Sequence, residues 1–256
     1  MLLFLATRQK TVKLPHLMQL RSAALTDIGK VRRENEDRFL CDDALRLYAI
    51  ADGIGGLPGG AQAAQHAVTR LRASIAATPP GTVPDLGCLT QRINETVCHL
   101  GLSLSPEHGL GTTLTYALVR DGRMHLAHVG DSRCYLLRKK TLHCLTTDHT
   151  IENEARARRA AGRTFSYDES QRKALTRCIG QNAPLEVDVS QYPLQTGDRL
   201  LICSDGIDKA IDEKELAGLI DAGIDPGAVM HALIALADDR GGADNATGVL
   251  VFVDAV

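Results

Sequence analysis

The strongest constraint on the fold is a series of short, alternating apolar and polar runs between residues 112 and 145. Such alternation is typical of β-strands that bury one face. Asp121 and Gly122 predict a tight hairpin turn between the first two runs, and further turns are expected at residues 130–132 and 139–140. Because strands joined by such short turns run in opposite directions, this part of the chain predicts an antiparallel sheet.

Helical patterns occur in pairs on both sides of this region. An Ala-rich amphipathic stretch predicts a helix over residues 61–77, and a second helix is expected over 86–104. Two more helices are expected over 212–222 and 226–238. Paired helices and antiparallel strands favour an α+β layered domain over a doubly wound βαβ fold.

Composition narrows the functional class. The chain has 256 residues and a formal net charge of −2, so it has no general electrostatic attraction for nucleic acid or for an anionic membrane. Its seven cysteines are odd in number and form no C-x-x-C pair, which favours a reducing compartment over a disulfide framework. The apolar run MLLFLA at the start is too short for a membrane span or a secretion signal. We therefore expect residues 1–20 to be a loosely ordered leader and the protein to be cytoplasmic, with no membrane span.

Acidic residues recur where strand-like runs end beside glycine or small polar residues. Asp52 in AIADG, Asp131 in HVGDS and Asp205 in ICSDG share this pattern. Asp37 stands just before another strand, and Asp244 lies in GADNAT. A single Asp before Gly is ordinary turn chemistry. Several carboxylates that converge would repel one another unless cations lie between them, and Mg²⁺ or Mn²⁺ are the natural occupants of such an oxygen-rich site.

The motifs that carry these acids resemble those of a known family. They are similar to the motifs of the type 2C metal-dependent serine/threonine protein phosphatases, in the bacterial form, and the resemblance runs from about Leu20 to the C-terminus. It implies one phosphatase domain over residues 21–256, a four-layer αββα sandwich of two antiparallel sheets flanked by helix pairs. A flap at about 148–184 would lie beside the metal cleft. In chain order, the motifs are VRRENEDRF, ADGIGG, GTTL, HVGDSR, LTTDHT, CSDGI and DNAT.

The resemblance also implies a centre of two metal ions. Asp52 would bridge both cations, and the Gly53 carbonyl would bind the second. Asp205 and Asp244 would bind the first. A hydroxide that bridges the two cations, Mn²⁺ or Mg²⁺, would attack the phosphorus of phosphoserine or phosphothreonine in line.

Further acids complete the implied set of ligands. Asp37 would hold the centre through metal-bound water. Asp131, together with Asp205, is similar to the residues that hold a third, weaker cation in bacterial members. The choice between Mg²⁺ and Mn²⁺ stays open, because both accept this set of oxygen ligands.

The phosphate group of the substrate needs a partner of its own. Arg32 stands five residues before Asp37, where the family has its phosphate-binding arginine. A guanidinium fork suits the oxygens of a phosphate monoester, and lysine is a poor substitute. We therefore expect Arg32 to bind the substrate, and Arg33 and Arg38 to be surface charges.

Two features depart from the family pattern. Some members, mainly eukaryotic, carry a histidine after the Asp-Gly pair as the proposed general acid, whereas Ile54 has no proton to donate here. The acid is left unassigned, and neither His66 nor His149 is favoured for the role. The flap is rich in arginine (EARARRAAGR), and these charges either attract an acidic or phosphorylated partner or form a solvated helix face.

The expected activity is dephosphorylation of a protein, by a monomer that reverses a protein kinase in bacterial signalling. Its partner would be the phosphorylated protein substrate. The alternative is a catalytically silent, phosphatase-like regulator that binds metal or phosphoprotein. Loss of a metal-binding Asp would favour that alternative, but every expected acid is present.

Overall fold

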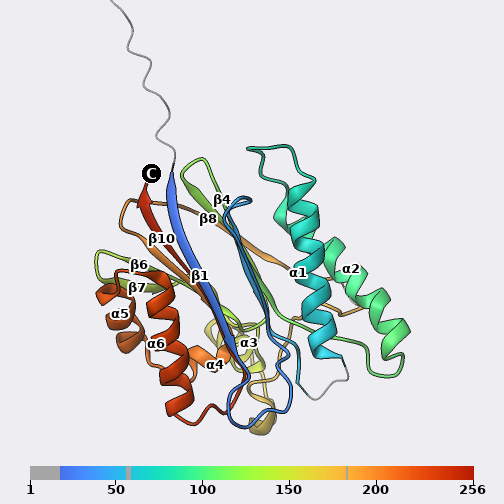
Figure 1. The fold of residues 1–256 in the computed structure, drawn as a ribbon. Coiled ribbons are helices and arrows are strands. Elements are labelled where there is room, and N and C mark those ends of the chain that lie inside the picture. The colour runs from blue at the N-terminus through green and yellow to red at the C-terminus, as the bar shows by residue number, and fades with distance from the viewer. Residues whose placement is uncertain (1–17, 56–58, 183) are drawn as a thin grey trace, which may run out of the picture.

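The chain folds into a sandwich of two five-stranded sheets between two layers of helices (Figure 1). The computed structural model describes residues 18–55, 59–182 and 184–256. Met18 is buried and the first strand begins at Gln19. The rest of the expected leader, residues 1–17, lies outside the described residues. The four layers confirm the expected αββα architecture.

Each sheet is antiparallel throughout. The first sheet has the order β1-β10-β9-β6-β7, and the second has the order β2-β3-β4-β5-β8. The strands of the first sheet are β1 (Gln19–Asp27), β10 (Ala246–Ala255), β9 (Arg199–Cys203), β6 (Arg133–Arg138) and β7 (Thr141–Cys144). Those of the second are β2 (Arg38–Asp42), β3 (Leu47–Ala51), β4 (Leu114–Arg120), β5 (Arg123–Val129) and β8 (Asp188–Pro193).

A pair of helices covers the outer face of each sheet, as Figure 1 shows. The second sheet packs against α1 (Gly60–Ala76) and α2 (Leu86–Leu104). The first sheet packs against α5 (Glu213–Ala222) and α6 (Pro226–Asp239). Two short helices lie at one end of the sandwich, near the loops that follow the strands. None of the helices in the described part of the chain is both long and apolar enough to cross a membrane. The helices are α1 (Gly60–Ala76), α2 (Leu86–Leu104), α3 (Ile151–Ala160), α4 (Asp205–Asp208), α5 (Glu213–Ala222) and α6 (Pro226–Asp239), with a 3₁₀ turn at Glu169–Gln171.

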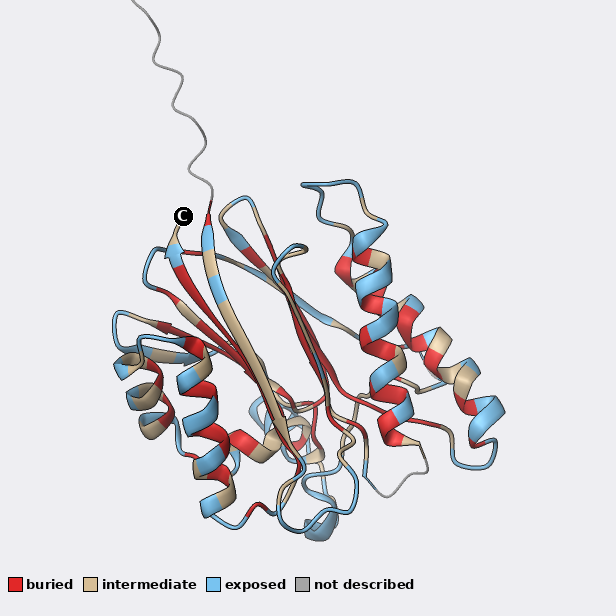
Figure 2. Ribbon diagram, viewed as in Figure 1, coloured by how far each residue is buried: buried red, intermediate tan, exposed pale blue. Residues whose placement is uncertain are grey.

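Three apolar layers hold the sandwich together. One lies between the second sheet and its helices, where Leu71 of α1 packs near Leu114 of β4. Another lies between the first sheet and α5 and α6. The third lies between the two sheets and includes Ile50 and Val251. Figure 2 shows the result, since the helices are buried on the faces turned toward the sheets and exposed on the others. Both sheets are thereby held rigidly enough to position the loops at their ends.

The strands between residues 112 and 145 do not form the single sheet that their short connections suggested. Strands β4 and β5 belong to the second sheet, whereas β6 and β7 belong to the first. The chain crosses at Gly130, whose φ of +114° is a conformation that L side chains rarely adopt. A Cβ atom there would lie 2.5 Å from Cγ2 of Thr113. The expected turn at residues 130–132 is therefore the crossing point between the sheets.

Candidate active site

The five acids singled out in the sequence come together at one end of the sandwich. Their charges act on one another, because Asp37, Asp205, Asp131 and Asp244 each raise the pKa of Asp52. Asp37 precedes β2 and Asp52 follows β3, both in the second sheet. The other three lie at the ends of strands of the first sheet or on the crossing between the sheets. We call these residues the acidic cluster: Asp37, Asp52, Asp131, Asp205 and Asp244.

Asp37 is the most buried member of the cluster, with an exposed fraction of 2%. Its Oδ2 accepts a hydrogen bond of 2.7 Å from the hydroxyl of Ser204. Its Oδ1 has no hydrogen-bond partner in the described part of the chain. Burial raises the pKa of Asp37 to about 7, against the opposing effect of the hydrogen bond from Ser204. A buried carboxylate oxygen without a partner is the kind of group that a cation or a bound water satisfies.

The backbone of Asp52 is fixed by the start of the neighbouring strand β4. Its N–H donates to the hydroxyl of Thr113 at 2.9 Å, and its carbonyl accepts from the N–H of Thr113 at 2.8 Å. The hydroxyl of Thr112 donates to the same carbonyl at 2.9 Å. Burial is the first cause that raises the pKa of Asp52 well above its usual range, and the charge of Asp37 is the next. The Asp52 backbone is thus fixed, and its side chain lies close enough to the other acids for their charges to raise its pKa.

Gly53 lies directly after Asp52 and is buried between two loops. Its N–H donates to the carbonyl of Glu36 at 3.3 Å, and it forms an isolated bridge with Thr112. These contacts tie the glycine-rich loop to the segment that carries Asp37. The backbone at Gly53 is therefore held in place, as the expected binding of a cation by its carbonyl requires.

Asp131 and Asp205 come from different segments of the chain and lie close to the same ammonium group, that of Lys209. Asp131 lies on the crossing from β5 to β6, and Asp205 begins α4. Burial raises the pKa of Asp131 to about 6, the charge of Asp205 adds to this, and Lys209 opposes it. Gly206 lets α4 start here, since a Cβ atom at this position would lie 2.0 Å from the carbonyl oxygen of Asn245.

Arg32 reaches the acidic cluster from the loop after β1. Its Nη2 lies 2.7 Å from Oδ2 of Asp244, and the two side chains are 40% and 35% exposed. The hydrogen bond to Asp244 raises the pKa of the Arg32 guanidinium further above its ordinary value. Arg33 is exposed and Arg38 donates to the carbonyls of Asn35 and Asp37. Of these three arginines, Arg32 is thus the one whose guanidinium contacts a side-chain carboxylate of the cluster, since Arg38 contacts only the backbone of Asp37.

The cluster has the chemistry of a divalent cation site, although its side chains are not closed around one point. Among the described residues, no three or more His, Cys, Asp or Glu side chains are arranged so as to enclose a metal ion. Two basic groups lie against the outer acids instead: Arg32 against Asp244 and Lys209 against Asp205. The donors are all oxygens, and Oδ1 of Asp37 is buried with no partner in residues 18–55, 59–182 and 184–256, which fits a hard cation such as Mg²⁺ or Mn²⁺.

Several positioning residues carry no catalytic signal in the sequence. The Asn35 side chain accepts from the N–H of Asp37 at 3.0 Å and donates to Thr26 at 2.8 Å. Asn245 accepts from the N–H of Glu36 at 2.9 Å and donates to two carbonyls of the same loop. These amides hold the loop that carries Arg32 and Asp37. In the sequence, the one feature that could have pointed to Asn35 and Asn245 is their position inside the motifs NED and DNAT.

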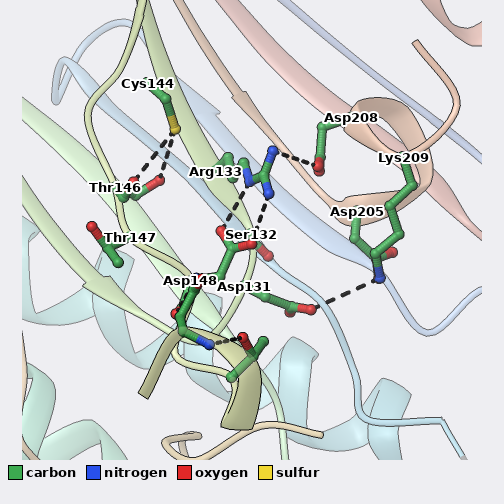
Figure 3. Close-up of polar contacts among 12 residues, drawn as sticks. Asp131, Ser132, Arg133, Cys144, Thr146, Thr147, Asp148, Asp205, Asp208 and Lys209 are labelled. Carbon is green, nitrogen blue, oxygen red and sulfur yellow. Dashed lines mark hydrogen bonds and ion pairs between the residues drawn. The ribbon is translucent and has the colours of Figure 1, made fainter. Parts of the chain in front are cut away.

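A cavity of about 420 Å³ opens beside the cluster, between the crossing loop and α3. Arg133 lines this cavity (Figure 3). Its guanidinium donates two hydrogen bonds to the carboxylate of Asp148, at 2.9 and 2.7 Å, and forms an ion pair of 3.0 Å with Asp208. Asp131 and Lys209 line the cavity at the side of the cluster. Residues of the expected flap, from Asp148 onward, therefore form one wall of the space next to the acids.

The two histidines considered as general acid, His149 and His66, lie elsewhere. His149 is buried, packs against His128 with ring centroids 4.6 Å apart and the rings tilted by 43°, and accepts from the N–H of Gly130 at 3.2 Å. Its Nε2 lies 3.2 Å from Asp188. His66 contacts Arg70 on α1. Neither ring contacts a member of the acidic cluster, so the general acid remains unassigned.

Comparison with known proteins places this arrangement in a family. Residues 18–246 match the family described as protein phosphatase 2C. The serine/threonine phosphatase Stp of Listeria welshimeri is 31% identical over 234 residues, which cover 88% of this chain and 93% of that protein. A solved serine/threonine phosphatase of S. agalactiae is 30% identical with a TM-score of 0.80, covering 92% of this chain and 100% of that one.

A second solved structure bears on the metal. It is the catalytic domain of the serine/threonine protein phosphatase PstP in complex with two manganese ions, 31% identical with a TM-score of 0.79. The similarity covers 93% of this chain and 99% of that domain. The family match, the shared sandwich fold and the acidic cluster agree with one another. The chain therefore belongs to the protein phosphatase 2C family, in its bacterial, serine/threonine-specific branch.

Proposed function

We propose that this chain is a metal-dependent phosphatase that removes phosphate from phosphoserine and phosphothreonine in proteins and so reverses a protein kinase in bacterial signalling. The observation that carries the proposal is the convergence of the acidic cluster at one end of the sandwich, with Arg32 against its edge. The activities of the relatives support the same conclusion.

We infer that two divalent cations, Mn²⁺ or Mg²⁺, bind between the acids of the cluster. Asp52 and the Gly53 carbonyl would hold them from the second sheet, and Asp205 and Asp244 from the first. Asp37 would hold the centre through water, since it is the deepest of the acids and its Oδ1 has no hydrogen-bond partner among the residues that the structure describes. When bound, such cations supply the Lewis acidity that activates water for attack on phosphorus and that neutralises the phosphate charge.

The protein's own side chains would bind and orient the substrate. Arg32 is half-exposed, so its guanidinium is accessible to a phosphate group from solvent. Its planar fork can donate two parallel hydrogen bonds to phosphate oxygens. Asp52, fixed through Thr112 and Thr113, would keep its carboxylate in one place during the reaction, which avoids reorganisation in the charged transition state.

The remaining parts of the proposal concern the chain as a whole. Residues 21–256 would act as one phosphatase domain, and residues 148–184 would form a flap beside the cluster. We further propose that the protein works as a cytoplasmic monomer and does not bind nucleic acid.

The test is hydrolysis of p-nitrophenyl phosphate, and of a phosphothreonine peptide, with Mn²⁺ and with an excess of chelator. We expect turnover that requires the metal and is lost with chelator. A chain that binds Mn²⁺ or phosphopeptide but shows no metal-dependent turnover at micromolar concentration would instead be the silent regulator.

A further inference from the structure

Lys209 places a positive charge between two acids that come from different parts of the fold. Its Nζ contacts Oδ2 of Asp205 and lies 3.9 Å from Oδ2 of Asp131. Asp131 belongs to the crossing between the sheets, and Asp205 begins α4 (Figure 3). The ammonium group is therefore shared by carboxylates that lie far apart in the sequence.

The local backbone fixes Lys209 in this place. It caps α4, and its N–H donates to the carbonyl of Asp205 at 2.9 Å. One helical turn separates the two residues, so both side chains lie on the same face. The contact between Lys209 and Asp205 thus follows from the short helix itself, and Asp131 is brought to it by the crossing loop.

The partial burial of the two carboxylates strengthens their electrostatic interaction with Lys209. The side chains of Asp131 and Asp205 are each 14% exposed, whereas that of Lys209 is 44% exposed. Within the described residues, Lys209 is the one basic side chain within 4.0 Å of either carboxylate. An ammonium group offers three donors and a compact charge, which allows it to serve two carboxylates at once.

We propose that Lys209 is a built-in counterion that takes the place of a divalent cation between Asp131 and Asp205. A cation that bridged these two carboxylates would have to displace the ammonium or lie against it, and like charges at such distances repel strongly. The inference rests on the proposed function only in that a pair of cations would bind at Asp52, the Gly53 carbonyl, Asp205 and Asp244. Its consequence is a chain with two cation sites, in which the third position implied by the family resemblance is filled by its own lysine.

The experiment counts bound Mn²⁺ in the full-length protein by equilibrium dialysis, with free Mn²⁺ read from its electron paramagnetic resonance signal. Lys209→Met removes the charge and keeps much of the stem, and Lys209→Gln is a second neutral variant in case the first fails to fold. Lys209→Arg keeps the charge. Lys214→Met, on the exposed face of α5, is the matched control for the loss of one positive charge.

We expect two Mn²⁺ per chain in the wild type, in Lys209→Arg and in Lys214→Met. The neutral variants at residue 209 should bind one more, with an affinity for this extra ion at least about tenfold above any extra binding by the wild type, because a unit charge has been removed from the site. Circular dichroism shows which variants are folded.

The decisive quantity is the difference between the wild type and the neutral variants. An equal number of Mn²⁺ ions in both, or the same gain in Lys214→Met, would overturn the role of Lys209. Fewer than two ions in the wild type would instead contradict the metal pair of the proposed function. The comparison of the variants would then still decide the role of Lys209.

Discussion

The hydroxyl of Ser204 donates a hydrogen bond of 2.7 Å to Asp37, and this bond joins the ends of the two sheets at the acidic cluster. The same hydroxyl accepts from the backbone N–H of Thr247 at 3.0 Å. Ser204 is fully buried and follows β9, whereas Asp37 precedes β2. One side chain therefore fixes the deepest acid of the cluster against β9 and β10 of the first sheet.

Ser204→Ala tests this link. Loss of the hydroxyl leaves Oδ2 of Asp37 and the N–H of Thr247 without their partner, which should lower the free energy of unfolding by about 1–3 kcal/mol. Because Asp37 is then held less firmly, the affinity for Mn²⁺ should fall as well. Urea unfolding and dialysis against Mn²⁺ measure the two effects. Unchanged values of both would show that the bond holds neither the fold nor Asp37.

Asp52→Asn and Asp244→Asn each remove a charge that the proposed cations require. Turnover of p-nitrophenyl phosphate should fall on the order of a thousandfold or more, since several kcal/mol of transition-state stabilisation depend on the metal centre. Asp239→Asn, on the exposed end of α6, removes the same charge away from the site and should leave turnover intact. Near-normal rates in Asp244→Asn would contradict its assignment as a ligand.

Arg32→Ala should raise KM for phosphate esters on the order of tenfold, because a charge-assisted hydrogen bond to the substrate is lost. The effect on kcat should be smaller, since the guanidinium binds the phosphate before as well as during the reaction. Arg33→Ala, one residue along the same loop, should leave KM at its wild-type value. Steady-state kinetics at saturating Mn²⁺ separate the two constants, and an unchanged KM in Arg32→Ala would exclude it as the phosphate-binding residue.

His128 should make the protein less stable as the pH falls. Burial lowers the pKa of His128 from 6.5 to about 4, so the unfolded chain binds a proton at a pH where the folded chain does not. The free energy of unfolding therefore falls as the pH drops below 6.5, and this residue alone should account for about 2 kcal/mol between pH 7.5 and pH 5.

His128→Gln removes this titration, so its unfolding free energy should depend less steeply on pH by that amount. Urea unfolding at several pH values, with enough salt to keep ionic strength constant, gives the slope. The same replacement at the exposed His143 is the control and should retain the wild-type slope. Equal slopes for wild type and His128→Gln would show that the buried ring is not the source.

The helices could be predicted closely because their signals are local. Helix α2 begins and ends where the sequence pattern placed it, at Leu86 and Leu104, and Asp85 caps it by accepting from the N–H of Cys88. Strand β8 was not expected. It is an edge strand with a mostly exposed, polar pattern and ends at Pro193, so its position depends on pairing with β5 rather than on its own periodicity.

The assignment of strands to sheets could not be predicted from alternation, because alternation is the same in either sheet. A short turn at Gly130 looks like a hairpin in the sequence, yet its backbone carries the chain from one sheet to the other. The acids could be recognised from their motifs. Their partners could not, since Ser204 and Lys209 reach Asp37 and Asp131 only through the tertiary fold.

The pairing of β1 with β10 has a consequence for how the protein is made. Among the described residues, strand β1 is hydrogen-bonded to β10 and to no other strand of its sheet, so the first strand pairs with one more than 200 positions later in the chain. The contact between Arg32 and Asp244 likewise joins residues that are 212 positions apart in the chain. Contacts so distant in sequence form slowly and late. A nascent chain would therefore carry an unpaired first strand, and an Arg32 without its acidic partner, until Asp244 and β10 have been synthesised.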